Sequence, residues 1–138
     1  MTKSLKLRAT DAEDVQVISA VLQDSIVPLC DMAFQPENDA FVMVAQRLKR
    51  ETGEAEPERI CCALTVKGVA SVKTQGIDLK DSDRILDLLA LIAQNGALEL
   101  VFAGGAKIRL DLKEWQALIE DFGESWPSSC SPCHDNGL

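Results

Sequence analysis

The sequence predicts an α+β fold in which an antiparallel sheet of about six to seven strands is accompanied by one helix near each end of the chain. Three observations predict this arrangement. Apolar residues recur at helical spacing near both ends, and they alternate with polar residues along most of the middle. Residues that favour turns separate the alternating segments, as expected for strands that follow one another antiparallel.

The length and composition indicate one soluble globular domain. The chain has 138 residues, of which 46% are hydrophobic and 26% are charged, and we place a single domain at residues 1–127. The formal net charge of −8 repels nucleic-acid phosphates and anionic lipids, so neither nucleic acid nor a membrane is an expected partner. No signal peptide or long apolar span is visible, so we expect a cytoplasmic protein with reduced cysteines.

A short strand and a helix are predicted at the N-terminal end. Apolar and basic side chains alternate over residues 5–8, which is typical of an edge strand. Thr10 and Glu13 have the spacing of a capping box, in which each side chain hydrogen-bonds to the other residue's backbone. Apolar residues at helical spacing follow, and this pattern predicts a helix over residues 11–23.

Alternating apolar and polar residues predict the strands in the first half of the sheet. These segments are residues 29–34, 41–49, 60–66 and 69–75. Turn-forming residues at 36–39 join the first two segments, and Lys67 and Gly68 join the last two. Residues 50–58 are acidic, have no apolar face, and are predicted to form a solvated loop.

The second half of the sheet depends on one ambiguous segment. Residues 85–94 fit a helix by their leucine and alanine content, and they fit a strand by their alternation. Asn95 and Gly96 decide for the strand, because a two-residue hairpin turn of type I′ requires a positive φ at both positions. The partner strand covers residues 97–102, a glycine pair then turns the chain, and residues 108–112 alternate as a further strand.

A C-terminal amphipathic helix is predicted after this strand. Asp111 and Glu114 have the spacing of an N-cap and its partner in the first turn. A single apolar stripe follows at helical spacing, made of Trp115, Leu118, Ile119 and Phe122. Gly123 is a natural helix end, and residues 128–138 are predicted to form a flexible, cysteine-containing tail.

The order of these elements resembles a pleckstrin-homology-like barrel, in which antiparallel strands are closed by one C-terminal amphipathic helix. We therefore expect either an open antiparallel sheet or such a barrel. The likeness concerns the fold alone, because folds of this kind carry many unrelated functions.

Several segments resemble a family of small uncharacterised bacterial proteins that are classed only as a domain of unknown function. The segments are Leu5-Lys6-Leu7-Arg8-Ala9, Asp31-Met32-Ala33-Phe34, Leu100-Val101-Phe102-Ala103-Gly104-Gly105, Ile108-Arg109-Leu110 and Asp121-Phe122-Gly123-Glu124-Ser125-Trp126-Pro127. The resemblance covers residues 5–127 and implies a bacterial, cytosolic, single-domain protein. The family has no established activity, so the resemblance transfers no site residue.

The segment Cys130-Ser131-Pro132-Cys133-His134 carries the candidate metal site. Its letters match the haem c attachment pattern, but the sequence shows neither an export signal nor a following domain that would enclose a haem. Cys130, Cys133 and His134 are candidate metal ligands, because thiolates and imidazole suit Zn²⁺, although a fourth ligand must come from elsewhere. The cysteine pair is also a candidate redox switch, and an incidental tail is the third alternative. We expect no bound cofactor.

The other cysteines have a structural explanation. Cys61 and Cys62 are adjacent in a predicted strand, so their side chains point to opposite faces and one of them is expected in the core. Cys30 is assigned the same structural role. A catalytic thiol needs a neighbouring base, and the single histidine of the chain, His134, lies in the predicted tail.

Three further features also have ordinary explanations. The aspartates between residues 78 and 87 lack the glycine and glutamate of a calcium loop, so we expect them in turns and caps. Gly104 and Gly105 fit a hairpin turn as well as an anion-binding nest. The dense basic cluster from Arg47 to Arg50 is expected on a solvated face, opposite the glutamates that follow it.

These observations favour a non-enzymatic binding or protein-interaction module. Histidine is scarce and tyrosine is absent, although both are common in catalysis. The partner is an unidentified protein or a second copy of the chain, because residues 88–92 are apolar on both faces and belong in a central strand or under another subunit. The alternative is a small thiol-dependent redox or metal-binding protein that uses Cys130, Cys133 and His134.

Overall fold

The computed structural model describes residues 5–49 and 58–127, and in this part of the chain an antiparallel sheet of eight strands accompanies one α-helix. The elements in chain order are β1 (Lys6–Ala9), α1 (Ala12–Leu22), β2 (Ile26–Pro28), β3 (Met32–Gln35), β4 (Ala40–Lys49), β5 (Glu58–Gln75), β6 (Ile85–Gln94), β7 (Ala97–Phe102) and β8 (Lys107–Pro127). Short 3₁₀ turns at Leu29–Asp31, Pro36–Asn38 and Ala103–Gly105 join some of the strands.

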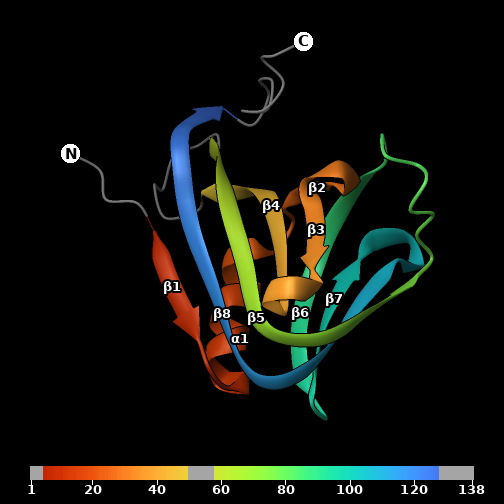
Figure 1. The fold of residues 1–138 in the computed structure, drawn as a ribbon. Coiled ribbons are helices and arrows are strands. Elements are labelled where there is room, and N and C mark those ends of the chain that lie inside the picture. Colours follow the sequence, from red (N-terminus) through yellow and green to blue (C-terminus); the bar gives the residue numbers. More distant parts are fainter. Residues whose placement is uncertain (1–4, 50–57, 128–138) are drawn as a thin grey trace.

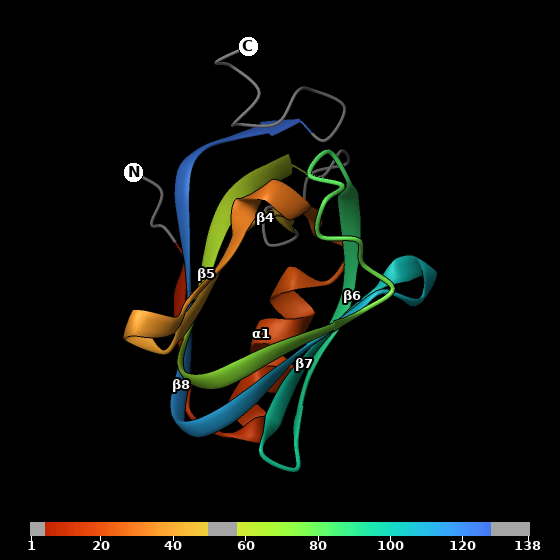
Figure 2. The same cartoon turned by 45° about the vertical axis from the view of Figure 1, so that its right-hand side comes forward.

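The strands pair around a ring rather than forming a flat sheet (Figure 1). Their order is β1-β8-β5-β4-β2-β6-β7, and the first part of β8 also pairs with β7, which closes the path. β1 lies beside β8, and β3 lies beside the first half of β4. Figure 2 shows α1 between the wall made by β5 and β8 and the wall made by β6 and β7.

The helix fills the inside of the curved sheet with apolar side chains. Val15, Ile18 and Leu22 are buried and belong to one core together with inward-facing residues of the strands. The helix begins one residue later than the capping-box pattern predicts, because Asp11 is the N-cap and accepts a hydrogen bond from the backbone N–H of Asp14. The Asp14 carboxylate in turn accepts from the backbone N–H of Thr10. The helix predicted over residues 11–23 is confirmed, with observed bounds Ala12–Leu22.

The prediction of a C-terminal helix is wrong, and so is the prediction of an α+β fold with two helices. Residues 107–127 form the single strand β8, and the described chain is mostly antiparallel sheet with one helix. Side chains along β8 alternate: Ala117, Ile119 and Asp121 are buried, whereas Phe122 is 45% exposed. The expected apolar stripe is therefore split between two faces. β1 and β5 supply hydrogen-bond partners on both sides of β8, and this pairing overrides the helical spacing.

The predicted turn at Lys67 and Gly68 is also wrong, because β5 runs without a break from Glu58 to Gln75. Gly68 has a φ of +87° and lies where β5 bends, next to a register shift in its pairing with β8. A Cβ atom at this position would collide with the backbone carbonyl of Glu114 on β8. The glycine thus permits close approach of two long strands instead of reversing the chain.

The hairpin between β6 and β7 is confirmed. Asn95 has a φ of +53° and Gly96 a φ of +73°, as a type I′ turn requires, and Gln94 pairs with Ala97. The ambiguous segment 85–94 is accordingly the strand β6.

The strand predicted over residues 29–34 is confirmed only in its second half, which belongs to β3, and the preceding strand β2 was not predicted. β2 ends at Pro28, the 3₁₀ turn Leu29–Asp31 follows, and β3 then begins at Met32. β2 pairs with β4 and β6 and is therefore one of the strands of the ring. β3 pairs with β4 alone, so after the turn the chain lies beside the ring and is not part of it. No helix in the described part of the chain is long and apolar enough to cross a membrane.

Candidate functional site

The motif with the most specific sequence pattern cannot be placed in the fold. Cys130, Cys133 and His134 lie outside the described residues, as does the predicted tail at 128–138. Within residues 5–49 and 58–127, no group of three or more histidine, cysteine or acidic residues could hold a metal ion. The metal and redox alternatives for the tail therefore stay predictions.

Among the aspartates between residues 78 and 87, Asp78 organises a turn, as expected, whereas Asp87 lies on strand β6. The side chain of Asp78 accepts from the backbone N–H of Lys80, and the backbone N–H of Asp81 donates to the Asp78 carbonyl. At the end of this loop the Arg84 guanidinium donates to the carbonyl of Gly76 at 2.7 Å. The loop from 76 to 84 thus has its two ends tied together.

Cysteine chemistry in the described chain differs from the expectation of reduced thiols. Cys61 is disulfide-bonded. Cys30 and Cys62 are free thiols, with Cys30 exposed rather than in the core. Cys62 faces the core as one of the adjacent pair was expected to do, and Cys61 is buried on the opposite face of β5.

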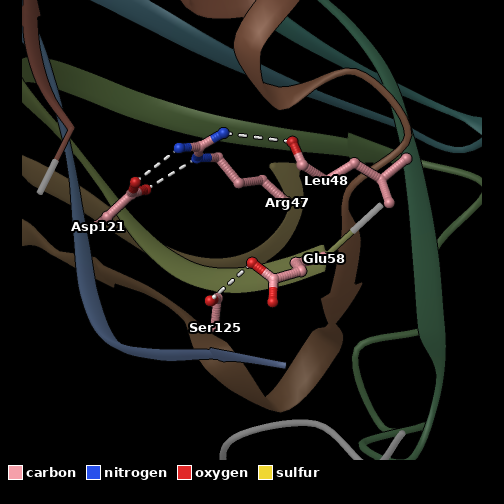
Figure 3. A network of polar contacts seen from close by, with 5 residues as sticks. All are labelled: Arg47, Leu48, Glu58, Asp121 and Ser125. Atoms are coloured by element: carbon pink, nitrogen blue, oxygen red, sulfur yellow. Dashed lines mark hydrogen bonds and ion pairs between the residues drawn. The ribbon is translucent and has the colours of Figure 1, made fainter. Parts of the chain in front are cut away.

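A buried ion pair links two strands inside the ring (Figure 3). The Arg47 guanidinium on β4 donates from Nε to Oδ1 of Asp121 at 2.8 Å and from Nη2 to Oδ2 at 2.6 Å. Its Nη1 donates to the backbone carbonyl of Leu48 at 3.2 Å. Both charged side chains are almost fully buried, with exposed fractions of 2% and 3%. Two parallel hydrogen bonds between planar groups are the strongest geometry for such a pair.

Cys62 lies next to this ion pair, and its thiol stays protonated mainly because it is buried. Burial raises the pKa of the Cys62 thiol to about 12, and the charge and hydrogen bond of Asp121 raise it further than Arg47 lowers it. A thiol with such a pKa is a poor nucleophile at neutral pH. The cluster of Arg47, Asp121 and Cys62 therefore has a structural role, in which each charge is compensated by its neighbour.

Sequence reasoning missed this cluster because it treated Arg47 as part of a solvated basic face and Asp121 as part of a helix. Residues 41–45 are all apolar, so the sequence does not show which face of β4 is inward, whereas in the structure Phe41, Met43 and Ala45 are the core residues. The same period of two places Arg47 on the inward face. A buried arginine needs an acidic partner, and that partner lies 74 residues away on β8.

An open apolar groove lies between α1 and the end of β4. It has a volume of about 640 Å³, and its walls include Val17 and Val21 of α1 and Leu48 of β4. Glu13 and Arg47 are the charged residues of this groove, and the Arg47 guanidinium is engaged by Asp121 and Leu48. The groove therefore offers a ligand mainly an apolar surface.

A second hollow opens between β3 and the second half of β5, and we call it the β3 pocket. It has a volume of about 360 Å³, within the range of small ligand sites. Its apolar walls are Leu29, Met32, Phe34, Phe41, Val72 and Ile108. Ala33 and Thr74 complete the wall, and Leu79 of the loop 76–84 stands at its border with 68% of its surface exposed. No charged side chain is among these described lining residues.

The β3 pocket runs along the free edge of β3. Met32, Ala33 and Phe34 of β3 line one side of the pocket, and Val72 and Thr74 of β5 line the other. Because β3 and β5 do not pair with each other, the pocket lies in the gap between these two strands. The other edge of β3 is occupied by β4, so the pocket lies beside the edge that no described strand covers.

Comparisons with known proteins identify a family but no function. A family model described as a protein of unknown function (DUF2948) matches residues 5–134. No curated protein and no solved structure matches the chain.

Proposed function

The chain belongs to DUF2948, a family of proteins of unknown function, and we propose that it is a non-enzymatic protein-interaction module that takes up an apolar side chain of its partner in the β3 pocket. The observation that carries this proposal is the chemistry of the pocket wall. Thr74 supplies the one hydroxyl among the described lining side chains, none of which is charged, and the other polar atoms of the wall belong to the main chain. Such a site favours an uncharged group through the loss of apolar surface from water.

The size of the β3 pocket supports a side chain as the occupant. An engineered protein cavity of about 150 Å³ is sufficient to bind benzene. The β3 pocket has a volume of about 360 Å³, so an aromatic or branched aliphatic side chain fits together with part of its backbone. Leu79 stands exposed at the border, where it would be covered by a partner.

The chemically active groups of the described chain lie away from the β3 pocket, which supports binding rather than catalysis. Arg47 and Asp121 neutralise each other inside the ring, and the Cys62 thiol stays protonated beside them. The alternative of a thiol-dependent protein rests on Cys130, Cys133 and His134, outside the described residues. Cytoplasmic location likewise stays a prediction.

Binding of the uncharged fluorophore Nile red tests the proposal, because its emission increases in an apolar site. Ala33→Trp places a large side chain at the border of the β3 pocket, and we expect it to weaken Nile red binding by about tenfold. Ala70→Trp is the matched control, since Ala70 is also an exposed alanine in a strand but lines no described pocket. Equal affinities of the two variants would contradict the proposed site.

Self-association through β6 is a second candidate function. Ile85, Leu89 and Ile92 are 61%, 43% and 40% exposed along this strand, whereas Leu88 and Leu91 are buried. The segment that is apolar on both faces thus turns one face to the core and the other outward, where a second copy would cover it. Sedimentation over a range of concentrations tests this, with Leu89→Lys expected to abolish any dimer.

A further inference from the structure

β3 is a strand with one edge that lacks a partner in the described chain. All four of its residues pair with β4, from Met32 opposite Met43 to Gln35 opposite Ala40. Among residues 5–49 and 58–127, no other strand pairs with β3. The β3 pocket lies beside this edge, so main-chain groups and an apolar pocket are available at the same place.

The edge of β3 also lacks the charges that commonly protect strand edges. Exposed edges attract other strands, and charged side chains on the edge prevent such pairing. β1 is a comparable strand, because it also has four residues and pairs on one side only, with β8. β1 carries Lys6 and Arg8, whereas the four residues of β3 are uncharged.

The segments next to the open edge carry more acidic than basic side chains, because residues 29–39 and 76–84 contain six carboxylates against the two basic residues Lys80 and Arg84. Glu37 lies two residues after β3, and Asp81 and Asp83 belong to the loop whose Leu79 borders the pocket. Within the described chain none of these three carboxylates forms an ion pair. The net charge of the whole chain is −8, so a positively charged segment is attracted both by this rim and at longer range.

We propose that the partner of this chain presents an extended, basic segment that adds as a strand to the free edge of β3 and inserts one apolar side chain into the β3 pocket. Main-chain hydrogen bonds to β3 supply affinity, and the pocket supplies selectivity for the inserted side chain. Basic side chains on the other face of the segment lie near Glu37, Asp81 and Asp83. The inference rests on the proposed function, because it specifies the partner of the same pocket.

The test uses a short synthetic peptide in which lysine alternates with valine and the central residue is leucine. In an extended conformation such a peptide has one apolar face and one basic face. Two further versions carry N-methyl groups on alternate amides, so that each version has one of its two edges blocked. A fourth peptide has glutamate in place of lysine, and a fifth has alanine in place of leucine.

Strand addition predicts a distinct pattern of affinities. With leucine in the pocket only one peptide edge faces β3, so one N-methylated version loses about tenfold or more in affinity while the other binds as the parent does. The glutamate and alanine peptides bind more weakly than the parent. On the protein side, Asp81→Asn combined with Asp83→Asn weakens binding by about threefold, whereas Asp87→Asn, an exposed aspartate on β6, has no effect.

Other outcomes overturn the inference and separate it from the proposed function. Equal binding of the two N-methylated peptides removes strand addition but leaves the apolar pocket as a binding site. Equal binding of the lysine and glutamate peptides removes the basic partner. If no peptide binds and the chain instead forms a dimer that Ala33→Trp dissociates, the occupant of the edge is a second copy. Failure of the wild-type protein to bind Nile red removes the proposed function itself.

Discussion

Arg47 and Asp121, 74 residues apart in the sequence, form two hydrogen bonds of 2.8 and 2.6 Å inside the ring and join β4 to β8 across β5. Both side chains are almost completely buried, so water cannot solvate their charges and each charge is compensated by the other. The pair fixes the relative position of the two strands at the end where β5 begins.

Removal of one member of this pair should be far more costly than removal of both. Arg47→Met leaves the Asp121 carboxylate buried without compensation, and we expect a loss of about 3–5 kcal/mol in the free energy of unfolding. Combining Arg47→Met with Asp121→Leu should restore most of that loss, because an apolar pair needs no compensation. Urea unfolding of the two single variants and the double variant measures the coupling. Additive losses would show that the two side chains act independently.

The Cys62 thiol should make stability depend on alkaline pH. Its pKa is about 12 in the folded chain, against 9.0 for an unperturbed thiol, so the folded state holds this proton more tightly than the unfolded state. The contribution to stability is complete below pH 9 and is lost as the pH rises towards 12, with a slope of up to about 1.4 kcal/mol per pH unit. Urea unfolding at a series of pH values measures it.

Variants at two cysteines separate the effect of Cys62 from that of other groups that titrate at high pH. Cys62→Ala should flatten the alkaline slope, whereas Cys30→Ala should keep it, since Cys30 is exposed. An unchanged slope in Cys62→Ala would show that the thiol is not the source.

Adjacent substitutions in β8 distinguish a strand from a helix. Ile119 is fully buried and Leu118 lies on the opposite face, only partly buried, so Ile119→Ala should cost about 2–5 kcal/mol and Leu118→Ala clearly less. On the helix expected from sequence, both residues belong to one apolar stripe and would lose similar amounts. Thermal or urea unfolding of both variants decides between the two arrangements.

Alanine substitutions at two glycines with similar φ angles distinguish the cost of backbone strain from the cost of a steric collision. Gly68 and Gly123 have φ values of +87° and +73°, so alanine is strained at both positions by about 1–2 kcal/mol. A Cβ at Gly123 meets nothing within 4 Å, whereas at Gly68 it meets the backbone of Glu114. Gly68→Ala should therefore destabilise much more than Gly123→Ala. Equal losses in denaturant unfolding would show that β5 and β8 do not approach closely at this bend.

The sequence predicted correctly the helix and the hairpin whose conformation depends on residues close together in the chain. The α1 helix has its cap and its apolar face within a single segment, and the β6–β7 hairpin depends on the adjacent residues Asn95 and Gly96. Residues 111–122 satisfied a helical pattern equally well on local grounds. Their conformation is decided by β1 and β5, whose pairing partners on β8 are distant in the sequence.

The candidate pocket was beyond the reach of sequence patterns for the same reason. Its wall combines the hairpin of β3 and β4 with Val72 and Ile108, which come together only through the long pairing of β5 with β8. One local sign was present: Leu79 is an apolar residue in an otherwise polar loop, and it proves to border the pocket. The free edge of β3 was hidden because residues 29–34 read as one strand, whereas a 3₁₀ turn separates β2 from β3.

Binding of a partner at β3 is tested most directly by a map of amide chemical-shift changes on addition of the lysine–leucine peptide. The largest changes are expected at Met32–Gln35 and in the loop 76–84, with smaller changes along the second half of β5. Ala33→Trp should suppress these changes. Changes that cluster instead on the exposed face of β6, around Leu89 and Ile92, would contradict binding at β3.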